Sequence, residues 1–248
     1  MSLLRSIRSE FIKLRHTAIL WFHILIPVIG SMVFLLYFAL YPQVEDNSKM
    51  SLVLELTAVV FPVIISVVCG MMAALEEKSS FQGMMSNKDG RTISYLSKLF
   101  TAIFLGGFST VVLIGMTMSG SSIFSLAQLP SRTFVLGSLG MFIGSVPLYT
   151  IHSFLSIKWG LGCSVFIGVV ECLLAIMFSN VNAVIWPFVP CTWGVKILQN
   201  IIYSASISAG LIIEKMGVAI IIIIVLSVAF LLLSFVWFQK WEGRKSFE

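Results

Sequence analysis

Long apolar runs, separated by short polar stretches, set the pattern of this chain. Each run holds roughly 20 residues, and at 1.5 Å per residue a helix of that length crosses a hydrocarbon core of about 30 Å. No run alternates polar with apolar residues, as the strands of a membrane barrel do. The pattern predicts an all-α integral membrane protein whose residues 1–248 form a single transmembrane domain. Its six spanning helices are expected at Thr17–Tyr41, Leu52–Leu75, Leu99–Met118, Phe134–Ile157, Leu161–Phe178 and Met216–Phe238.

Composition and charge agree with this interpretation. Hydrophobic residues make up 58% of the chain and charged residues only 11%, whereas a soluble domain carries about 25% charged residues. If the N-terminus is cytoplasmic, twelve of the sixteen Lys and Arg residues fall on the cytoplasmic side. The positive-inside rule therefore predicts cytoplasmic N- and C-termini. The basic excess forms no compact patch with interleaved aromatic residues, so nucleic acid is not an expected partner.

The first 16 residues carry a helical stripe of apolar side chains. Ile7, Phe11 and Leu14 recur at spacings of three and four, and the basic residues lie largely off this stripe. Such a segment predicts an amphipathic elbow helix in the inner headgroup layer, leading into the first span. A simple topology anchor without a partner is the alternative.

The longest cytoplasmic loop, residues 76–98, has features of a docking element. Phe81, Met84 and Met85 are spaced to form one apolar face on a short helix, and Met and Phe supply adaptable apolar contact. This spacing suggests a coupling helix that docks in a groove of a soluble partner, with a solvated loop as the alternative. The candidate coupling residues are Glu76, Glu77, Phe81, Gln82, Met84 and Met85.

The fifth span and the segment after it contain the most unusual residues. Glu171 lies inside an apolar helix, where a carboxylate costs a few kcal/mol and is often functional. Trp186–Trp193 holds two prolines and is too short to cross a bilayer, which predicts a re-entrant or interfacial segment. Glu55 lies near the start of the second span. The candidate transport-pathway residues are therefore Glu171, Glu55, Trp186 and Trp193.

Gly140 and Gly144 form a G-x-x-x-G spacing in the fourth span. Such a spacing allows two helices to approach closely, and we expect packing inside the subunit rather than dimerisation. His23 is expected to be a satisfied interior residue. The cysteines have no spacing typical of a metal site or a disulfide framework, so we interpret them as small buried hydrophobic residues.

Sequence motifs of enzymes are missing. The chain has no G-x-x-x-x-G-K-[ST] phosphate loop, no H-E-x-x-H and no G-x-S-x-G. The pair Glu76-Glu77 resembles the start of a membrane-protease motif, but the arginine and the two histidines that should follow are absent. We therefore predict no catalytic and no metal-binding residues, and no cofactor held by this chain.

Four stretches match a known family in the expected order. They are E-C-L-L-A-I-M-F at Glu171–Phe178, I-W-P-F-V-P-C-T-W at Ile185–Trp193, S-E-F-I-K-L-R-H at Ser9–His16, and E-E-K-S-S-F-Q-G-M-M-S at Glu76–Ser86, which exits through L-S-K at Leu96–Lys98. In these stretches the chain resembles the lantibiotic-immunity permeases of ABC transporters, in particular the MutG-type subunit of the type-2 exporters. The N-terminal and loop features are shared by many type-2 exporters, whereas the segment after Glu171 is more specific.

The resemblance implies a function and a set of partners. It implies a six-helix permease in a bacterial plasma membrane that pairs with a second permease, as a heterodimer or homodimer, and with two copies of a separate ATPase. ATP and magnesium would bind to that ATPase. The complex would expel a lantibiotic-type antimicrobial peptide from the bilayer and so give the cell self-immunity, a form of antibiotic resistance.

Two alternatives stay open at this point. One is a permease of another type-2 ABC exporter, for a bacitracin-like antibiotic, a drug or a glycan. The other is a stand-alone membrane immunity or sensor protein without an ATPase. Co-purification of an ATPase separates the exporters from the stand-alone protein.

Overall fold

A computed structural model describes residues 3–85, 90–179, 185–206 and 213–243 of the chain. The described residues form helices and no strands. The sequence also predicts turns at Ser179–Asn182 and Lys88–Arg91, and both lie partly outside the described residues. The helices are α1 (Leu3–Leu14), α2 (Ala18–Leu40), α3 (Asp46–Glu77), α4 (Gln82–Met85), α5 (Arg91–Ile123), α6 (Ser131–Trp159), α7 (Leu161–Ser179), α8 (Trp193–Ser206) and α9 (Ile213–Lys240), with two 3₁₀ turns, η1 (Trp186–Phe188) and η2 (Pro190–Thr192).

Six of these helices, α2, α3, α5, α6, α7 and α9, are long and apolar enough to cross a membrane. The predicted all-α, multi-pass architecture is thereby confirmed. The helices α3, α5 and α6 extend beyond the predicted spans, because they continue past the apolar runs into polar residues. At 1.5 Å per residue, the 33 residues of α5 extend about 50 Å, well beyond a hydrocarbon core of about 30 Å.

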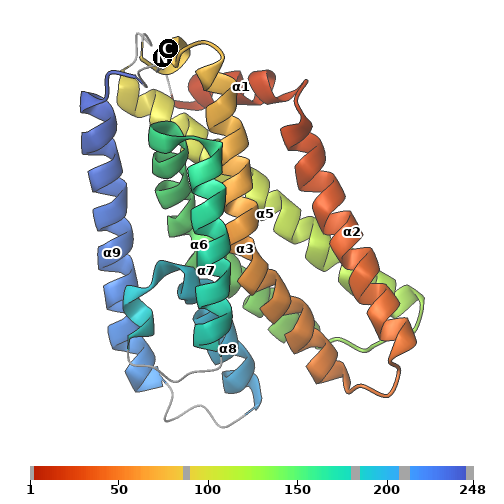
Figure 1. The fold of residues 1–248 in the computed structure, drawn as a ribbon. Coiled ribbons are helices and arrows are strands. Elements are labelled where there is room, and N and C mark those ends of the chain that lie inside the picture. The colour runs from red at the N-terminus through yellow and green to blue at the C-terminus, as the bar shows by residue number, and fades with distance from the viewer. Residues whose placement is uncertain (1–2, 86–89, 180–184, 207–212, 244–248) are drawn as a thin grey trace.

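The bundle is built around α3 and α6 (Figure 1). α3 packs mainly on α7 and α6, α6 packs on α8, and α2 packs on α5. α1 lies across one end of the bundle, where α4 and the C-terminal turn of α9 also gather, and α8 lies at the opposite end (Figure 1). We call these the α1 end and the α8 end.

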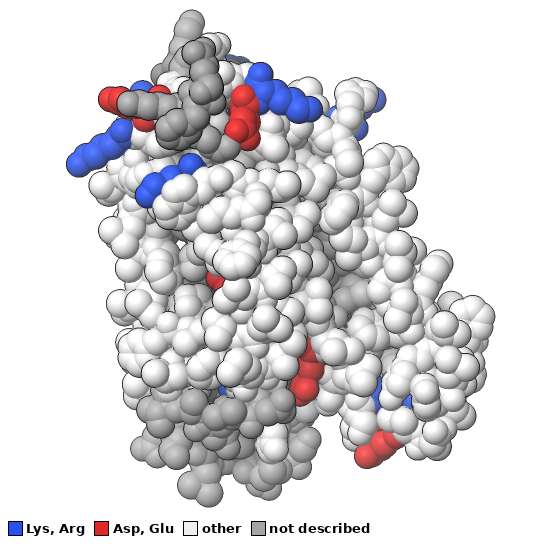
Figure 2. Space-filling model, viewed as in Figure 1, with Lys and Arg blue, Asp and Glu red and all other residues white. Residues whose placement is uncertain are grey.

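The surface has the polarity of a membrane protein. Figure 2 shows charged side chains gathered toward the two ends, with a broad uncharged belt that holds only isolated acidic atoms between them. Large apolar side chains are exposed along this belt, among them Val111 (67%), Leu233 (67%) and Phe166 (69%). Because exposed apolar surface on this scale is unfavourable in water, the belt is suited to contact with lipid.

A close contact between α6 and α8 runs through glycine. A Cβ atom at Gly144 of α6 would lie 2.8 Å from the backbone N and 2.9 Å from the Cα of Gly194 in α8. At Gly140 a Cβ would instead meet the side chains of Ile201 and Ile197. The prediction that the G-x-x-x-G face packs inside the subunit is confirmed.

Replacing Gly144 by Ala should push α6 and α8 apart, because the atoms in the way are backbone atoms that cannot rotate aside. We expect the variant to lose about 1–3 kcal/mol of folding free energy, as overpacked cores do. Thermal unfolding of the purified protein in detergent would measure the loss. Gly115→Ala is the matched control, since a Cβ there meets nothing within 4 Å; equal unfolding midpoints for the two variants would contradict the proposed contact.

Candidate functional site

Four charged side chains meet at the α1 end, and we call them the charge cluster: Glu10, Lys13, Glu76 and Lys98. Lys13 Nζ lies 2.7 Å from Glu10 Oε1 and 2.8 Å from Glu76 Oε1. Lys98 Nζ lies 2.9 Å from Glu10 Oε2 and 3.0 Å from Glu76 Oε1. Each ion therefore has two partners of opposite charge, and the cluster joins α1 to the end of α3 and the start of α5.

The charge cluster is buried but electrically neutral. Glu10, Glu76 and Lys98 are each about 95% buried, which would cost several kcal/mol per ion if they were unpaired. Lys13 is more exposed. Burial alone would lower the pKa of its ammonium group, but hydrogen bonds to Glu10 and Glu76 outweigh this effect and raise the pKa. Lys13 therefore remains charged in neutral solution.

The predicted coupling loop begins beside the charge cluster. Ser80 and Phe81 have left-handed backbone angles, φ 50° and 58°, and the Phe81 N–H donates to Glu76 O at 2.8 Å. This turn closes the end of α3 in the manner of a helix C-cap. The helix expected here forms only as the single turn α4, Gln82–Met85.

The apolar face of this loop points into the chain itself. Phe81 is 2% and Met84 1% exposed, and the Phe81 ring lies edge-on against Trp241 with centroids 4.9 Å apart. Met85 is half-buried, whereas Glu77 and Gln82 are exposed. Of the predicted coupling residues, only these two therefore present largely exposed side chains.

The loop is also tied to the C-terminal end of α9. The guanidinium of Arg91 donates to the backbone oxygens of Gln239 and Trp241, both at 3.0 Å. Trp241 stacks on Phe238 with ring centroids 5.8 Å apart. Such contacts satisfy carbonyl groups that a helix end leaves open. The loop is thus fixed by ions on one side and by aromatic rings on the other.

A second polar site lies within the apolar belt. His152 Nε2 of α6 lies 2.8 Å from Glu171 Oε2 of α7, and His152 Nδ1 lies 3.1 Å from Ser164 Oγ. Ser164 Oγ donates to the backbone oxygen of Ser66 in α3 at 3.1 Å. His152 is fully buried, and the Glu171 side chain is 13% exposed.

The donor arrangement determines where protons lie in this site. When the hydroxyl hydrogen of Ser164 is directed to Ser66 O, Ser164 Oγ accepts from His152 Nδ1–H. One further proton must lie between His152 Nε2 and Glu171 Oε2, because two lone pairs 2.8 Å apart would repel. Whichever atom holds it, the pair has no net charge. This neutrality explains how Glu171 is tolerated inside an apolar helix.

The other predicted pathway residues have separate positions. Trp193 is completely buried and donates from Nε1 to Pro187 O at 2.9 Å, while Trp186 is half-buried. The turn η2 packs on α7, and its Cys191 is close enough to Glu171 to feel its charge. The structure thus brings the proline-containing segment to Glu171. Glu55 lies apart from that pair, within electrostatic reach of Lys196 in α8.

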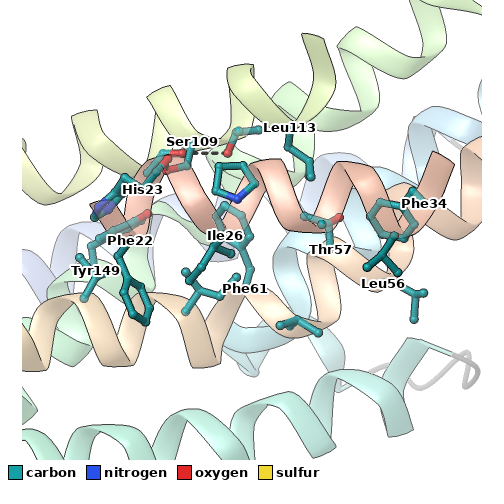
Figure 3. A pocket seen from close by; sticks show the side chains of 18 residues that line it. Phe22, His23, Ile26, Phe34, Leu56, Thr57, Phe61, Ser109, Leu113 and Tyr149 are labelled. Carbon is teal, nitrogen blue, oxygen red and sulfur yellow. Dashed lines mark hydrogen bonds between the residues drawn. The ribbon is translucent and has the colours of Figure 1, made fainter. Parts of the chain in front are cut away.

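An apolar cavity of about 360 Å³ opens between α2, α3 and α5, with Tyr149 of α6 at its wall (Figure 3). Several of its hydroxyl groups donate to the backbone: Ser109 Oγ donates to His23 O at 2.9 Å, and Thr57 Oγ1 donates to Val53 O at 2.6 Å. The wall is therefore almost wholly hydrocarbon. His23 itself contacts Ile19 O through Nδ1 at 2.7 Å, as expected for a satisfied interior residue.

Sequence reasoning missed Glu10, Lys98 and His152 as functional partners. In each case the partner is distant in the chain; Glu10 and Lys98, for example, are 88 positions apart. The sequence feature that could have indicated these partners is the presence of other ionisable residues near span ends, which could neutralise Glu76 and Glu171. No sequence feature could have predicted the cavity, because its lining residues have the same composition as the lipid-facing surface.

No model of a known protein family, no curated protein and no solved structure matches the chain.

Replacing Lys98 by Met should leave Glu10 and Glu76 buried with Lys13 as their one shared cation. Removing one partner of a buried ion pair costs about 3–5 kcal/mol, and we expect a loss of this size in detergent-based unfolding. Lys78→Met is the control, because Lys78 is exposed at the end of α3 and should change stability by less than about 0.5 kcal/mol. Equal effects of the two changes would mean that the charge cluster does not stabilise the fold.

A double-mutant cycle should detect the His152–Glu171 pair. His152→Leu leaves a carboxylate without its partner, and Glu171→Leu leaves an imidazole without its partner, whereas the double variant leaves neither. We expect the double variant to be more stable than the sum of the single effects by about 0.5–3 kcal/mol. Unfolding in detergent measures all three, and strict additivity would show that the two side chains do not interact.

Proposed function

We propose that this chain is the permease subunit of an ABC exporter that expels a lantibiotic-type antimicrobial peptide from the membrane and so confers self-immunity. The energy comes from a separate ATPase, which binds ATP and magnesium. A second permease chain completes the transport pathway. The proposal places the chain in a bacterial plasma membrane with both termini in the cytoplasm.

The observation that supports this proposal most is the fixation of loop 76–98 at the α1 end. The charge cluster joins the loop's first residue, Glu76, to α1 and α5, and Trp241 holds its middle against α9. A force applied to the exposed residues Glu77 and Gln82 would therefore reach three long helices together. This is the mechanical property that an ATPase-driven permease requires.

The proposal assigns roles to two further segments, and an apolar cavity supports it. In it, α1 serves as the elbow helix of the inner headgroup layer, and Trp186–Trp193 is a re-entrant or interfacial segment on the outer side. The apolar cavity between α2, α3 and α5 can admit the hydrocarbon part of a membrane-inserted cargo, since its size of about 360 Å³ lies within the usual range for ligand pockets. Export then requires that the cargo bind differently to two arrangements of the permease pair.

A stand-alone membrane immunity protein is the second candidate. It is favoured by the burial of Phe81 and Met84 inside the subunit. In a docking element that seats itself in a partner's groove, these side chains would supply the apolar contact. In the exporter proposal the ATPase instead contacts the polar face of the loop. Changes on that face should therefore affect an exporter but not a stand-alone protein.

The test is co-purification with an ATPase from the native host after charge reversal on the exposed face of the loop. The double variant Glu77→Arg, Gln82→Arg should lose the ATPase, identified by mass spectrometry, while the variant still purifies as a folded protein. The matched control is Gln43→Arg, Glu45→Arg, which alters an exposed loop at the opposite end of α2 and α3. Retention by the first variant would move the docking site elsewhere, and absence of any ATPase from the wild-type protein would favour the stand-alone candidate.

A further inference from the structure

One oxygen of the Glu171 carboxylate is left open by its surroundings. Oε2 bonds His152 at 2.8 Å, whereas Oε1 has no hydrogen-bond partner among the residues that the structure describes. The side chain is 13% exposed, and Oε1 is not among the fully buried atoms that lack a partner. Oε1 can therefore be reached from outside. An accessible carboxylate oxygen within an apolar belt is a strong acceptor for a charged donor.

The chemistry of the site restricts the ligand to one class. A carboxylate oxygen repels anions and accepts hydrogen bonds, and a positively charged donor forms a stronger hydrogen bond with it than a neutral donor does. In the described part of the chain, no group of three His, Cys, Asp or Glu side chains could hold a metal ion. A primary ammonium group fits what remains, because it is compact, positively charged and carries only hydrogen-bond donors.

We propose that Glu171 binds a primary ammonium group of a membrane-inserted ligand through Oε1, and that His152 releases one proton when the ligand binds. Before binding, His152 and Glu171 share one proton and have no net charge. The ammonium group brings one positive charge. Loss of the second proton from His152 leaves an ionised Glu171, a neutral imidazole and the ammonium group, so the site again has no net charge.

The hydroxyl of Ser164 makes this exchange possible without moving a helix. Its oxygen lies 3.1 Å from both Ser66 O and His152 Nδ1. While Nδ1 carries hydrogen, the hydroxyl donates to Ser66 O. After the proton leaves Nδ1, the hydroxyl rotates and donates to Nδ1, while His152 Nε2–H continues to donate to Glu171.

The other titratable groups around the His152–Glu171 pair either bond other atoms or cannot supply the released proton. Cys191 of η2 and Cys172 of α7 are near Glu171, but both are uncharged thiols in neutral solution. On α3, Cys69 contacts Tyr149 O and Ser153 rather than the pair, and Lys196 of α8 donates to Ser179 O. The released proton therefore originates from His152.

This inference goes beyond the proposed export function. It concerns ligand binding by the isolated chain, so it holds or fails whether or not an ATPase docks at the α1 end. If no ATPase co-purifies with the protein, the export proposal fails, but the proposed ammonium binding at Glu171 is unaffected.

The first experiment measures binding of dodecylamine to the purified protein in uncharged detergent micelles. Near neutral pH this amine is charged, as a lysine side chain is. It should raise the unfolding midpoint by several degrees, whereas dodecanol, with the same chain and no charge, should not. Glu171→Gln should lose the shift, since its amide can still bond His152 but cannot bind a cation. Glu55→Gln, which changes the other half-buried carboxylate of the spans, should keep the shift.

Two results would overturn ammonium binding at Glu171. One is an equal shift with dodecanol, which would indicate apolar binding alone. The other is an equal shift in Glu171→Gln, which would place the cation elsewhere. Dodecyltrimethylammonium, which is charged but has no N–H, should give a smaller shift than dodecylamine; an equal shift would remove the hydrogen bond to Oε1 from the proposal.

The second experiment counts protons released to a pH indicator in weakly buffered solution. Wild-type protein should release about one proton per bound dodecylamine, and its affinity should therefore rise up to about tenfold per pH unit. His152→Gln retains a donor for Glu171 but has no proton to lose, so it should bind the amine without release. Release from His152→Gln equal to that from wild type would overturn the exchange.

Discussion

The charge cluster is the interaction on which the α1 end of the protein depends. Glu10, Lys13, Glu76 and Lys98 come from three helices, and every ion contacts two of opposite sign. A single buried pair gains little over an apolar contact, because desolvation offsets most of the Coulomb attraction. Four ions that share partners satisfy more of their hydrogen-bonding capacity for the same burial. The network therefore specifies where α1 crosses the bundle more than it adds to net stability.

The cluster explains the shape of the loop that follows α3. Glu76 takes part through its side chain and, through its backbone oxygen, accepts from the N–H of Phe81. The left-handed turn at Ser80 and Phe81 is thus anchored to a residue that cannot move without exposing buried ions. Trp241 and Arg91 fix the other side of the loop. The described part of this short segment, with its one helical turn, is thus held by contacts to long helices on both sides.

The sequence was sufficient to predict the six spans but not the sites. A hydrocarbon solvent permits only helices with continuous apolar surface, so composition and length were enough to identify them. Helix ends were less predictable, because α3 and α5 continue into polar residues that no longer meet lipid. The spacing of Phe81 and Met84 correctly indicated an apolar face, but spacing does not say what that face contacts, and here Phe81 contacts Trp241, directly after α9. His152 and Glu171 are 19 residues apart on adjacent helices, and their contact depends on how α6 and α7 pack.

The two charged sites of this chain meet the same physical requirement in different ways. Both are electrically neutral, as burial in a medium of low polarity demands. The charge cluster is closed: its carboxylates are each bonded by two ammonium groups, so further ligands would have to displace a partner. The His152–Glu171 pair is open, since one carboxylate oxygen lacks a described partner and the proton between the side chains can be given up. A closed neutral cluster is suited to holding helices together, whereas an open neutral pair is suited to exchanging one positive charge for another. This difference, rather than the mere presence of charge in the membrane belt, separates the structural site from the site at which a ligand can act.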